Sequence, residues 1–159
     1  MSAVREIGPE DWRLWRALRL RALEEAPEAF GATLASALDG DAQGGEAYWH
    51  GYFTRPGSAL IAEVDGVPVG MARVVVEDGP AHLYSMWVAP EARGRGVGAH
   101  LVTTGTDWLA AHHPGRALRL EVVESNLPAR RLYSHCGFAV VGPNPEDAAE
   151  IVMEHVPDR

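Results

Sequence analysis

Apolar residues recur along this chain at two spacings, one typical of helices and the other typical of strands. From Trp12 they fall at helical intervals, which predicts a helix over residues 12–25 that ends before Pro27. Residues 30–42 are mixed and contain glycine, so they predict a loop; a second helix follows Gly44-Gly45 and ends at Pro56-Gly57. Further helices are predicted over residues 97–112 and 127–135, and strands over residues 3–7, 59–64, 67–76, 82–88, 118–123, 138–141 and 151–155.

The order of these elements is β-α-α-β-β-β-α-β-α-β-β. The Asp65-Gly66 pair between two strands is typical of a hairpin, which indicates antiparallel pairing in the first half. In the second half, strands alternate with helices, which requires a crossover connection and indicates locally parallel strands. We therefore expect a single domain over residues 1–159, of the α+β class, with a mixed central sheet of about seven strands and helices on both faces.

Composition narrows the class of protein. Hydrophobic residues make up 47% of the chain and charged residues 23%, which is typical of a globular protein, and a net charge of −8 argues against nucleic-acid binding. The single cysteine excludes an internal disulfide. The N-terminus resembles no secretion signal and no run of 18 apolar residues occurs, so we expect a cytoplasmic protein without membrane contact. The seven histidines lack the ligand spacing of a zinc centre, so we expect no metal.

A glycine-rich turn joins the strand at 82–88 to the helix at 97–112. It reads Arg93-Gly94-Arg95-Gly96-Val97-Gly98. Glycines let several backbone amides converge on one point, and the helix that begins there adds its own free N–H groups and positive dipole end. Two arginines add positive charge. The turn is therefore a candidate site for a phosphate or a pyrophosphate.

Two familiar phosphate loops do not match this turn. The P-loop pattern requires a Gly-Lys-Ser/Thr ending, which is absent, and the dinucleotide pattern requires G-x-G-x-x-G, whereas the spacing here is G-x-G-x-G. A nucleotide-phosphate enzyme would also need a paired aspartate for magnesium, and none is evident.

A second segment of interest follows the strand at 118–123. Asn126 can cap the next helix, with Pro128 in its first turn. Ala129, Arg130 and Tyr133 lie three, four and seven residues later, on the same side of that helix. One helix face therefore offers an amide, a small residue, a cation and a phenol to a single ligand.

Together these segments resemble the GNAT superfamily of acyl-CoA-dependent N-acyltransferases. Arg93-x-x-Gly96-x-Gly98 is similar to the superfamily's pyrophosphate-binding pattern [Gln/Arg]-x-x-Gly-x-[Gly/Ala]. Asn126-x-x-Ala129-x-x-x-Tyr133, followed by Gly137-Phe138, resembles its second hallmark. The resemblance implies an enzyme that moves an acetyl group from acetyl-CoA, its co-substrate, to a primary amine by direct attack in a ternary complex.

The resemblance also implies roles for the residues that bind the co-substrate. The backbone of Met86, Trp87 and Val88 would pair with the pantetheine arm and point at the thioester carbonyl. The pyrophosphate would lie on the amides of residues 93–98, and Arg130 or Arg131 would reach the ribose 3′-phosphate. The full set of expected contacts is Met86, Trp87, Val88, Arg93, Gly94, Arg95, Gly96, Val97, Gly98, Asn126, Ala129 and Arg130.

For catalysis, the resemblance implies that Tyr133 is the general acid for the departing thiolate. A phenol with a pKa near ~10 holds its proton at neutral pH. The base is open: Glu121 matches a carboxylate that is the base in some members, His82 stands where others have one, and many members use a water relay.

The resemblance places the acceptor site at the first two helices and their connection, a region rich in aromatic and acidic residues. Aromatic residues at helical spacing are also typical of a core. A peptide N-terminus, an amino acid, a polyamine and an aminoglycoside are all compatible acceptors, and a homodimer is compatible too. The alternative function is a non-catalytic acyl-CoA-binding sensor or regulatory module, against which Tyr133 and Glu121 argue.

Overall fold

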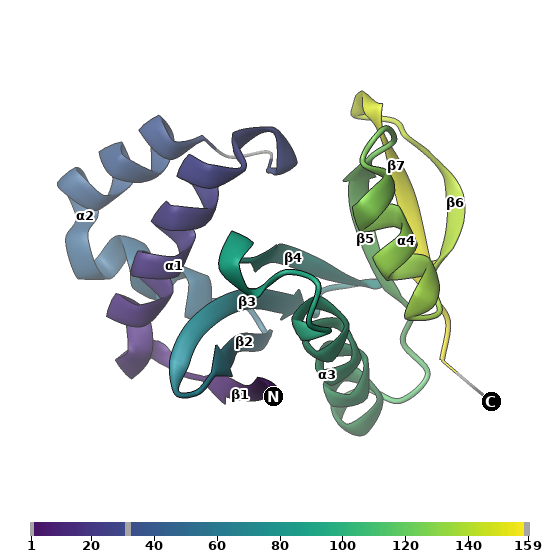
Figure 1. Cartoon of the computed structure of the whole chain (residues 1–159), viewed down its shortest axis with the longest axis horizontal. Coiled ribbons are helices and arrows are strands. Elements are labelled where there is room, and N and C mark those ends of the chain that lie inside the picture. The colour runs from purple at the N-terminus through teal and green to yellow at the C-terminus, as the bar shows by residue number, and fades with distance from the viewer. Residues whose placement is uncertain (1, 31–32, 158–159) are drawn as a thin grey trace.

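The computed structural model describes residues 2–30 and 33–157, which form a twisted sheet covered by helices (Figure 1). Within those residues the sheet has seven strands in the order β1-β2-β3-β4-β5-β7-β6. The strands are β1 (Ser2–Ile7), β2 (Gly57–Val64), β3 (Val67–Val75), β4 (Ala81–Val88), β5 (Leu118–Val123), β6 (Ala139–Asn144) and β7 (Asp147–His155). The α-helices are α1 (Trp12–Glu25), α2 (Leu34–Thr54), α3 (Val97–His112) and α4 (Leu127–His135). The described residues include no helix long and apolar enough to cross a membrane.

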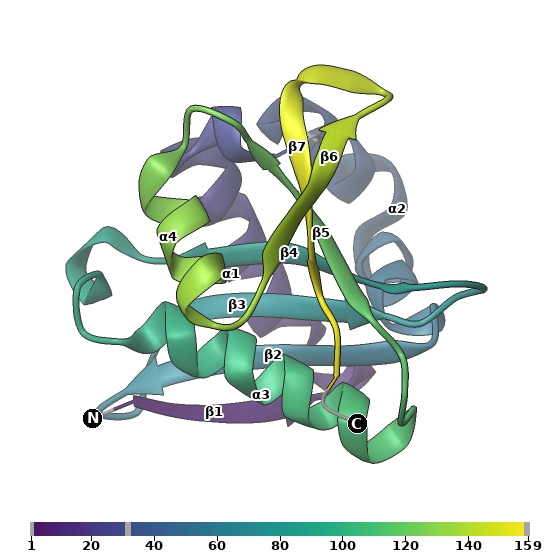
Figure 2. The same ribbon diagram turned by 90° about the vertical axis from the view of Figure 1, so that its right-hand side faces the viewer.

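Strands β1 to β4 pair antiparallel, and the predicted hairpin at Asp65-Gly66 joins β2 to β3 with both residues at positive φ. Helices α1 and α2 cover one face of these strands, and α3 covers the other (Figure 2). The apolar faces of these helices meet the sheet in a continuous core, in which Trp15, Trp49 and Leu101 are fully buried. The predicted arrangement of helices on both faces of a mixed sheet is confirmed.

The predicted loop over residues 30–42 is wrong from Leu34 onward, because α2 begins there; residues 31–32 of that prediction lie outside the described residues. The Thr33 side chain caps this helix by accepting from the Ser36 amide at 3.1 Å. Gly40 does not break the helix; a Cβ there would lie 2.4 Å from the Tyr48 ring, so the glycine gives that ring room. The predicted start after Gly44-Gly45 instead coincides with a kink, where Gly45 has a non-helical φ of 52°.

A carboxylate in the first part of α2 ties it to α1. Asp41 accepts two hydrogen bonds from Arg16, at 2.7 and 2.9 Å, and one from the Trp49 indole at 2.7 Å. These bonds lower the pKa of Asp41 to about 2, the Arg16 bond contributing most. Such tertiary contacts explain why this segment is helical despite its glycines.

The second half of the sheet turns away from the first. Only β4 and β5 run parallel, and their pairing is limited to Ala81 with Leu118 and His82 with Arg119. Beyond those pairs the strands diverge, so β5, β6 and β7 run across the direction of β1 to β4 (Figure 2). β6 and β7 form a longer hairpin than the sequence predicts, and Pro143 is tolerated because β6 is the edge strand.

Candidate active site

The glycine-rich turn adopts a conformation that requires its glycines. Gly94 and Gly96 have φ of 77° and 79°, in the left-handed region that favours glycine, and no atom lies within 4 Å of a Cβ built at either position. Gly96 is also the N-cap of α3, so the first amides of that helix are free of helical partners and point out of its N-terminus. The turn thus presents backbone donors and a positive dipole end, as the sequence predicts for an anion site.

The arginine that begins the turn has a structural partner. The Arg93 guanidinium donates to Glu25 of α1 at 2.8 Å and to the Val88 carbonyl at 3.0 Å. The Trp87 indole donates to the same Glu25 carboxylate at 2.9 Å. Hydrogen bonds from Arg93 and Trp87 lower the pKa of Glu25, which keeps it ionised. Arg93 therefore fastens the turn to α1 and β4, and its charge is balanced within the protein.

Strand β4 carries a bulge in the part of the strand that has diverged from β5. Met71 of β3 pairs with Trp87 whereas Arg73 pairs with Tyr84, so β4 has one extra residue between these pairs. Ser85 lies in the bulge and has a φ of 58°, an unusual value for a residue other than glycine. From Leu83 onward, the edge of β4 that faces β5 has no strand partner among the described residues. Backbone groups at such an edge need another partner, which a ligand with amide groups can supply.

A cavity of about 860 Å³, here called the large cavity, extends from the glycine-rich turn along this edge to α4. This volume is within the range of pockets for small molecules and cofactors. Ten of the twelve residues predicted to bind the co-substrate line it, and Arg95 and Arg130 do not. Those that line it are Met86, Trp87, Val88, Arg93, Gly94, Gly96, Val97, Gly98, Asn126 and Ala129.

Helix α4 forms the opposite wall of the large cavity. Asn126 is its N-cap, and its side chain accepts from the Ala129 amide at 3.3 Å, as the sequence predicts. Arg130 instead donates to the Glu124 carbonyl at 3.0 Å, so this arginine holds the turn that precedes the helix. Tyr133 is buried, and its burial raises the pKa of the phenol well above its ordinary value.

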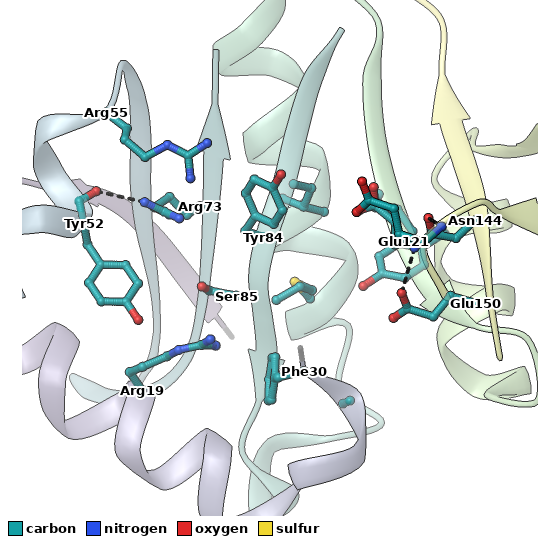
Figure 3. Close-up of a pocket in the computed structure, with 16 residues that line it drawn as sticks. Arg19, Phe30, Tyr52, Arg55, Arg73, Tyr84, Ser85, Glu121, Asn144 and Glu150 are labelled. Atoms are coloured by element: carbon teal, nitrogen blue, oxygen red, sulfur yellow. Dashed lines mark hydrogen bonds between the residues drawn. The ribbon is translucent and has the colours of Figure 1, made fainter. Parts of the chain in front are cut away.

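A second cavity of about 450 Å³ lies between α1, the end of α2, β4 and the β6–β7 hairpin (Figure 3). It shares four lining residues with the large cavity: Ala29, Phe30, Met86 and Tyr133. The phenol of Tyr133 and the bulge of β4 thus lie where the two cavities meet. A group bound in one cavity can therefore reach a group bound in the other at this junction.

The two predicted base candidates lie together on neighbouring strands. His82 Nε2 is 3.6 Å from Glu121 Oε1, an ion-pair distance that is longer than an ordinary hydrogen bond. Glu121 lines the second cavity, whereas His82 lines neither cavity and stacks on Tyr84. The interaction with His82 lowers the pKa of Glu121, although burial acts in the opposite direction. At neutral pH Glu121 is therefore a carboxylate that faces the second cavity.

Sequence reasoning missed most of the charged residues of the second cavity. Arg19 and Arg73 are buried in it, and Arg55 lines it as well. Glu146 and Glu150 come from the β6–β7 hairpin on the other side. A signal for the arginines was present, because Arg19 interrupts the apolar stripe of the first helix and Arg73 interrupts an apolar strand. Of the aromatic residues in the first two helices and their connection, Phe30 and Tyr52 line this cavity, whereas Trp15 and Trp49 belong to the core.

Comparison with known proteins identifies similar sequences. A family model described as the acetyltransferase (GNAT) family matches residues 12–138, a range that ends before the β6–β7 hairpin. A mycothiol acetyltransferase of Clavibacter sepedonicus is 33% identical over 137 residues, which cover 86% of this chain and 42% of that protein. The chain therefore spans less than half the length of that relative.

Solved structures of the same fold include two acetyltransferases. The structure of a GNAT-family acetyltransferase from Streptococcus pneumoniae has a TM-score of 0.76 and 18% identity, covering 99% of this chain and 100% of that one. The PaiA N-acetyltransferase of Thermoplasma acidophilum, solved in complex with coenzyme A, has a TM-score of 0.76 and 15% identity, covering 99% of both chains. At these identities the similarity shows the fold, and it confirms the predicted fold class.

Proposed function

Because this chain belongs to the acetyltransferase (GNAT) family, we propose that it is an N-acetyltransferase that moves the acetyl group of acetyl-CoA to a primary amine. The observation that carries the proposal is the meeting of two cavities at Tyr133 and the β4 bulge. The large cavity offers backbone donors to a phosphorylated, amide-containing molecule, and the second cavity offers charged side chains to a small polar one. Transfer between two bound substrates requires such a junction.

In this proposal, acetyl-CoA occupies the large cavity. The pyrophosphate lies on the amides of residues 93–98 and on the N-terminus of α3, where the left-handed glycines direct several N–H groups to one side. The pantetheine arm lies along β4, and its amides complete the edge that β5 leaves unpaired. The thioester then reaches the bulge at Ser85 and Met86, where a backbone N–H can donate to the carbonyl oxygen as negative charge develops on it.

The amine enters from the second cavity and loses its proton to Glu121, which His82 keeps ionised. Its nitrogen attacks the thioester carbon, and the carbon–sulfur bond breaks as the tetrahedral intermediate collapses and the nitrogen loses its second proton to water. Tyr133 donates its proton toward the departing sulfur and recovers one from water. Because burial raises the pKa of Tyr133, the phenol carries that proton throughout the neutral range. The products are the N-acetyl compound and free coenzyme A.

The only cysteine supports direct transfer. Cys136 follows α4 at its C-terminal end and lines neither of the two cavities. A covalent acyl-enzyme formed on this thiol would therefore place the acetyl group away from the junction. The charged second cavity also argues against a purely regulatory acyl-CoA-binding module, because such a module has no need for a site beside the thioester.

Substitution of Tyr133 by phenylalanine tests this proposal. We expect turnover to fall at least about tenfold, because the thiolate then leaves without a donor, while the affinity for acetyl-CoA changes little. Thiol release with an amine identified in a screen reports turnover, and calorimetric titration with acetyl-CoA reports affinity. Tyr48→Phe is the matched control, because Tyr48 lies on α2 and lines neither cavity. Turnover equal to that of the wild type in Tyr133→Phe would remove Tyr133 from the mechanism.

A further inference from the structure

Two buried arginines of the second cavity lack a counter-ion. Arg19 of α1 is 6% exposed and Arg73 of β3 is 8% exposed. Among the described residues, Arg19 Nε and Nη1 and Arg73 Nε have no hydrogen-bond partner, and neither arginine forms an ion pair with a carboxylate. Arg73 Nη1 donates to the Tyr52 carbonyl at 3.2 Å. Arg19 lies over the Phe30 ring at 4.7 Å and Arg73 over the Tyr52 ring at 5.0 Å. The aromatic rings hold these cations in place without neutralising them.

The surroundings of these arginines raise the cost of their burial. Burial lowers the pKa of Arg73, and the like charges of Arg55 and Arg19 lower it further. Arg55 has an acidic partner, because it donates to Glu77 at 2.8 Å. The chain has 22 acidic residues against 14 basic ones, so a shortage of acidic residues does not explain why Arg19 and Arg73 lack a carboxylate partner. A buried, unpaired cation is costly to a folded protein unless something else supplies the opposite charge.

The opposite wall of the cavity has the opposite charge. Glu121 on β5 faces the arginines across Tyr84 and Ser85, and Glu150 lies beside it on β7 (Figure 3). The Asn144 amide donates to Glu150 at 3.0 Å. The second cavity is therefore cationic at one end and anionic at the other, and its volume of about 450 Å³ suits a small molecule.

We propose that the acceptor is a small amine that also carries a carboxylate, with enough bonds between the two groups to reach both ends of the cavity, as in an ω-amino acid or the side-chain amine of a basic amino acid. The carboxylate binds to Arg19 and Arg73, whose free N–H donors are those that a carboxylate accepts. The ammonium group then faces Glu121, beside the junction with the large cavity. The proposal disfavours polyamines and aminoglycosides, which are compatible with the sequence, because some of their positive charges would meet the arginines. This assignment depends on the N-acetyltransferase activity proposed above.

A matched panel of amines tests the assignment. Each amino acid is compared with its own carboxamide, in which only the carboxylate is removed, and thiol release from acetyl-CoA gives kcat/KM for both. We expect at least one amino acid to exceed its amide by about 10- to 100-fold, the range that hydrogen bonds to a charged group contribute. The comparison is conservative, because an amino acid amide has the less basic amine and so more of it is unprotonated. Equal kcat/KM for acids and amides, or a preference for a phosphorylated amine, would overturn the proposal.

Variants of the arginines link the preference to this site. Arg19→Gln and Arg73→Gln should raise KM for the preferred amino acid about 10-fold or more and bring its kcat/KM close to that of the amide, with KM for acetyl-CoA unchanged. Arg5→Gln is the control, because Arg5 pairs with Glu63 on β1 and β2 and lines neither cavity. An undiminished preference for the acid in both variants would overturn the proposal.

Binding measurements separate this proposal from the proposed activity. If the protein binds acetyl-CoA but turns over no amine, amino acids and amides are titrated into the coenzyme A complex, and the midpoint of thermal unfolding is followed. A rise with amino acids only supports the carboxylate site, and no rise with any amino acid overturns it. Failure to bind acetyl-CoA contradicts the proposed activity. In that case amino acids and amides are titrated into the free protein, and a rise in the thermal midpoint with amino acids only still supports the carboxylate site.

Discussion

Replacing Gly96 with alanine tests whether the left-handed turn before α3 binds the pyrophosphate of coenzyme A. Gly96 has a φ of 79°, and no atom lies within 4 Å of the position that a Cβ would take. Alanine therefore meets no steric clash, and its whole effect comes from backbone strain. The strain of an L-residue in the left-handed region is about 1–2 kcal/mol.

This strain appears in two measurable quantities. Alanine also restricts the unfolded chain, which restores about 0.4–1 kcal/mol, so the free energy of unfolding falls by at most about 1.5 kcal/mol. If the turn of the free protein relaxes, coenzyme A must restore the left-handed conformation on binding. Its affinity then falls about 5- to 30-fold, since each 1.4 kcal/mol corresponds to a factor of ten.

Gly115→Ala is the matched control. Gly115 has a φ of 88°, its Cβ position is equally open, and it lies in the turn after α3, at the other end of that helix from the large cavity. We expect a comparable strain at this position but no loss of affinity. Calorimetric titration with coenzyme A measures the affinity, and scanning calorimetry measures unfolding, where 1 kcal/mol corresponds to about 2–4 °C in a chain of this length.

Two results would refute the reasoning. The strain must lower the free energy of unfolding, the affinity for coenzyme A, or both. If Gly96→Ala equals the wild type in both quantities, position 96 does not require a left-handed conformation. An equal loss of affinity in Gly115→Ala would show that the effect on binding arises from general destabilisation.

Three further predictions concern other parts of the molecule. Glu121→Gln should lower kcat at neutral pH, and the deficit should shrink as pH rises and more of the amine is unprotonated; a deficit independent of pH would contradict the role of Glu121 as a base. Asp41 has a pKa of about 2 in the folded state, against about 3.9 in an unfolded chain, so its contribution to stability is complete above about pH 5 and is lost as pH falls toward 2. The difference in thermal midpoint between the wild type and Asp41→Asn should therefore shrink over that range, and a constant difference would contradict the assignment. Gly40→Ala should reduce the free energy of unfolding by up to about 2 kcal/mol in denaturant titrations, because the overlap of the new methyl group with the Tyr48 ring costs about 1–3 kcal/mol and the gain in helix propensity offsets about 1 kcal/mol of it; a clear rise in stability would show that the ring moves aside freely.

The parts of the site that the sequence predicts follow local rules. A glycine at positive φ and an asparagine that caps a helix depend on a few adjacent residues, so the turn at 93–98 and the start of α4 could be predicted in detail. Helix periodicity similarly placed Tyr133 on the Asn126 side of α4, and both residues line the large cavity.

The parts that the sequence does not predict depend on contacts between distant segments. Gly40 looks like a helix breaker in the sequence, but its role is set by the Tyr48 ring eight residues away. The divergence of β4 and β5 depends on the twist of the whole sheet, and no local pattern reports it. Arg19 and Arg73 each interrupt an apolar pattern in the sequence, but only the folded chain shows that both are buried in one cavity without an acidic partner.

The residues that we propose for binding the acetyl donor and those that we propose for binding the acceptor come from different elements of the fold. Every residue that we assign to the acetyl donor comes from the segment between β4 and α4, whereas Arg19 and Arg73 come from α1 and β3 and line the second cavity but not the large one. The two cavities share just four lining residues among those that the structure describes. A change at position 19 or 73 can therefore alter the charge that the acceptor must carry while the donor site keeps all its contacts. In the proposed mechanism the glycine-rich turn selects the donor, and Arg19 and Arg73 select the acceptor.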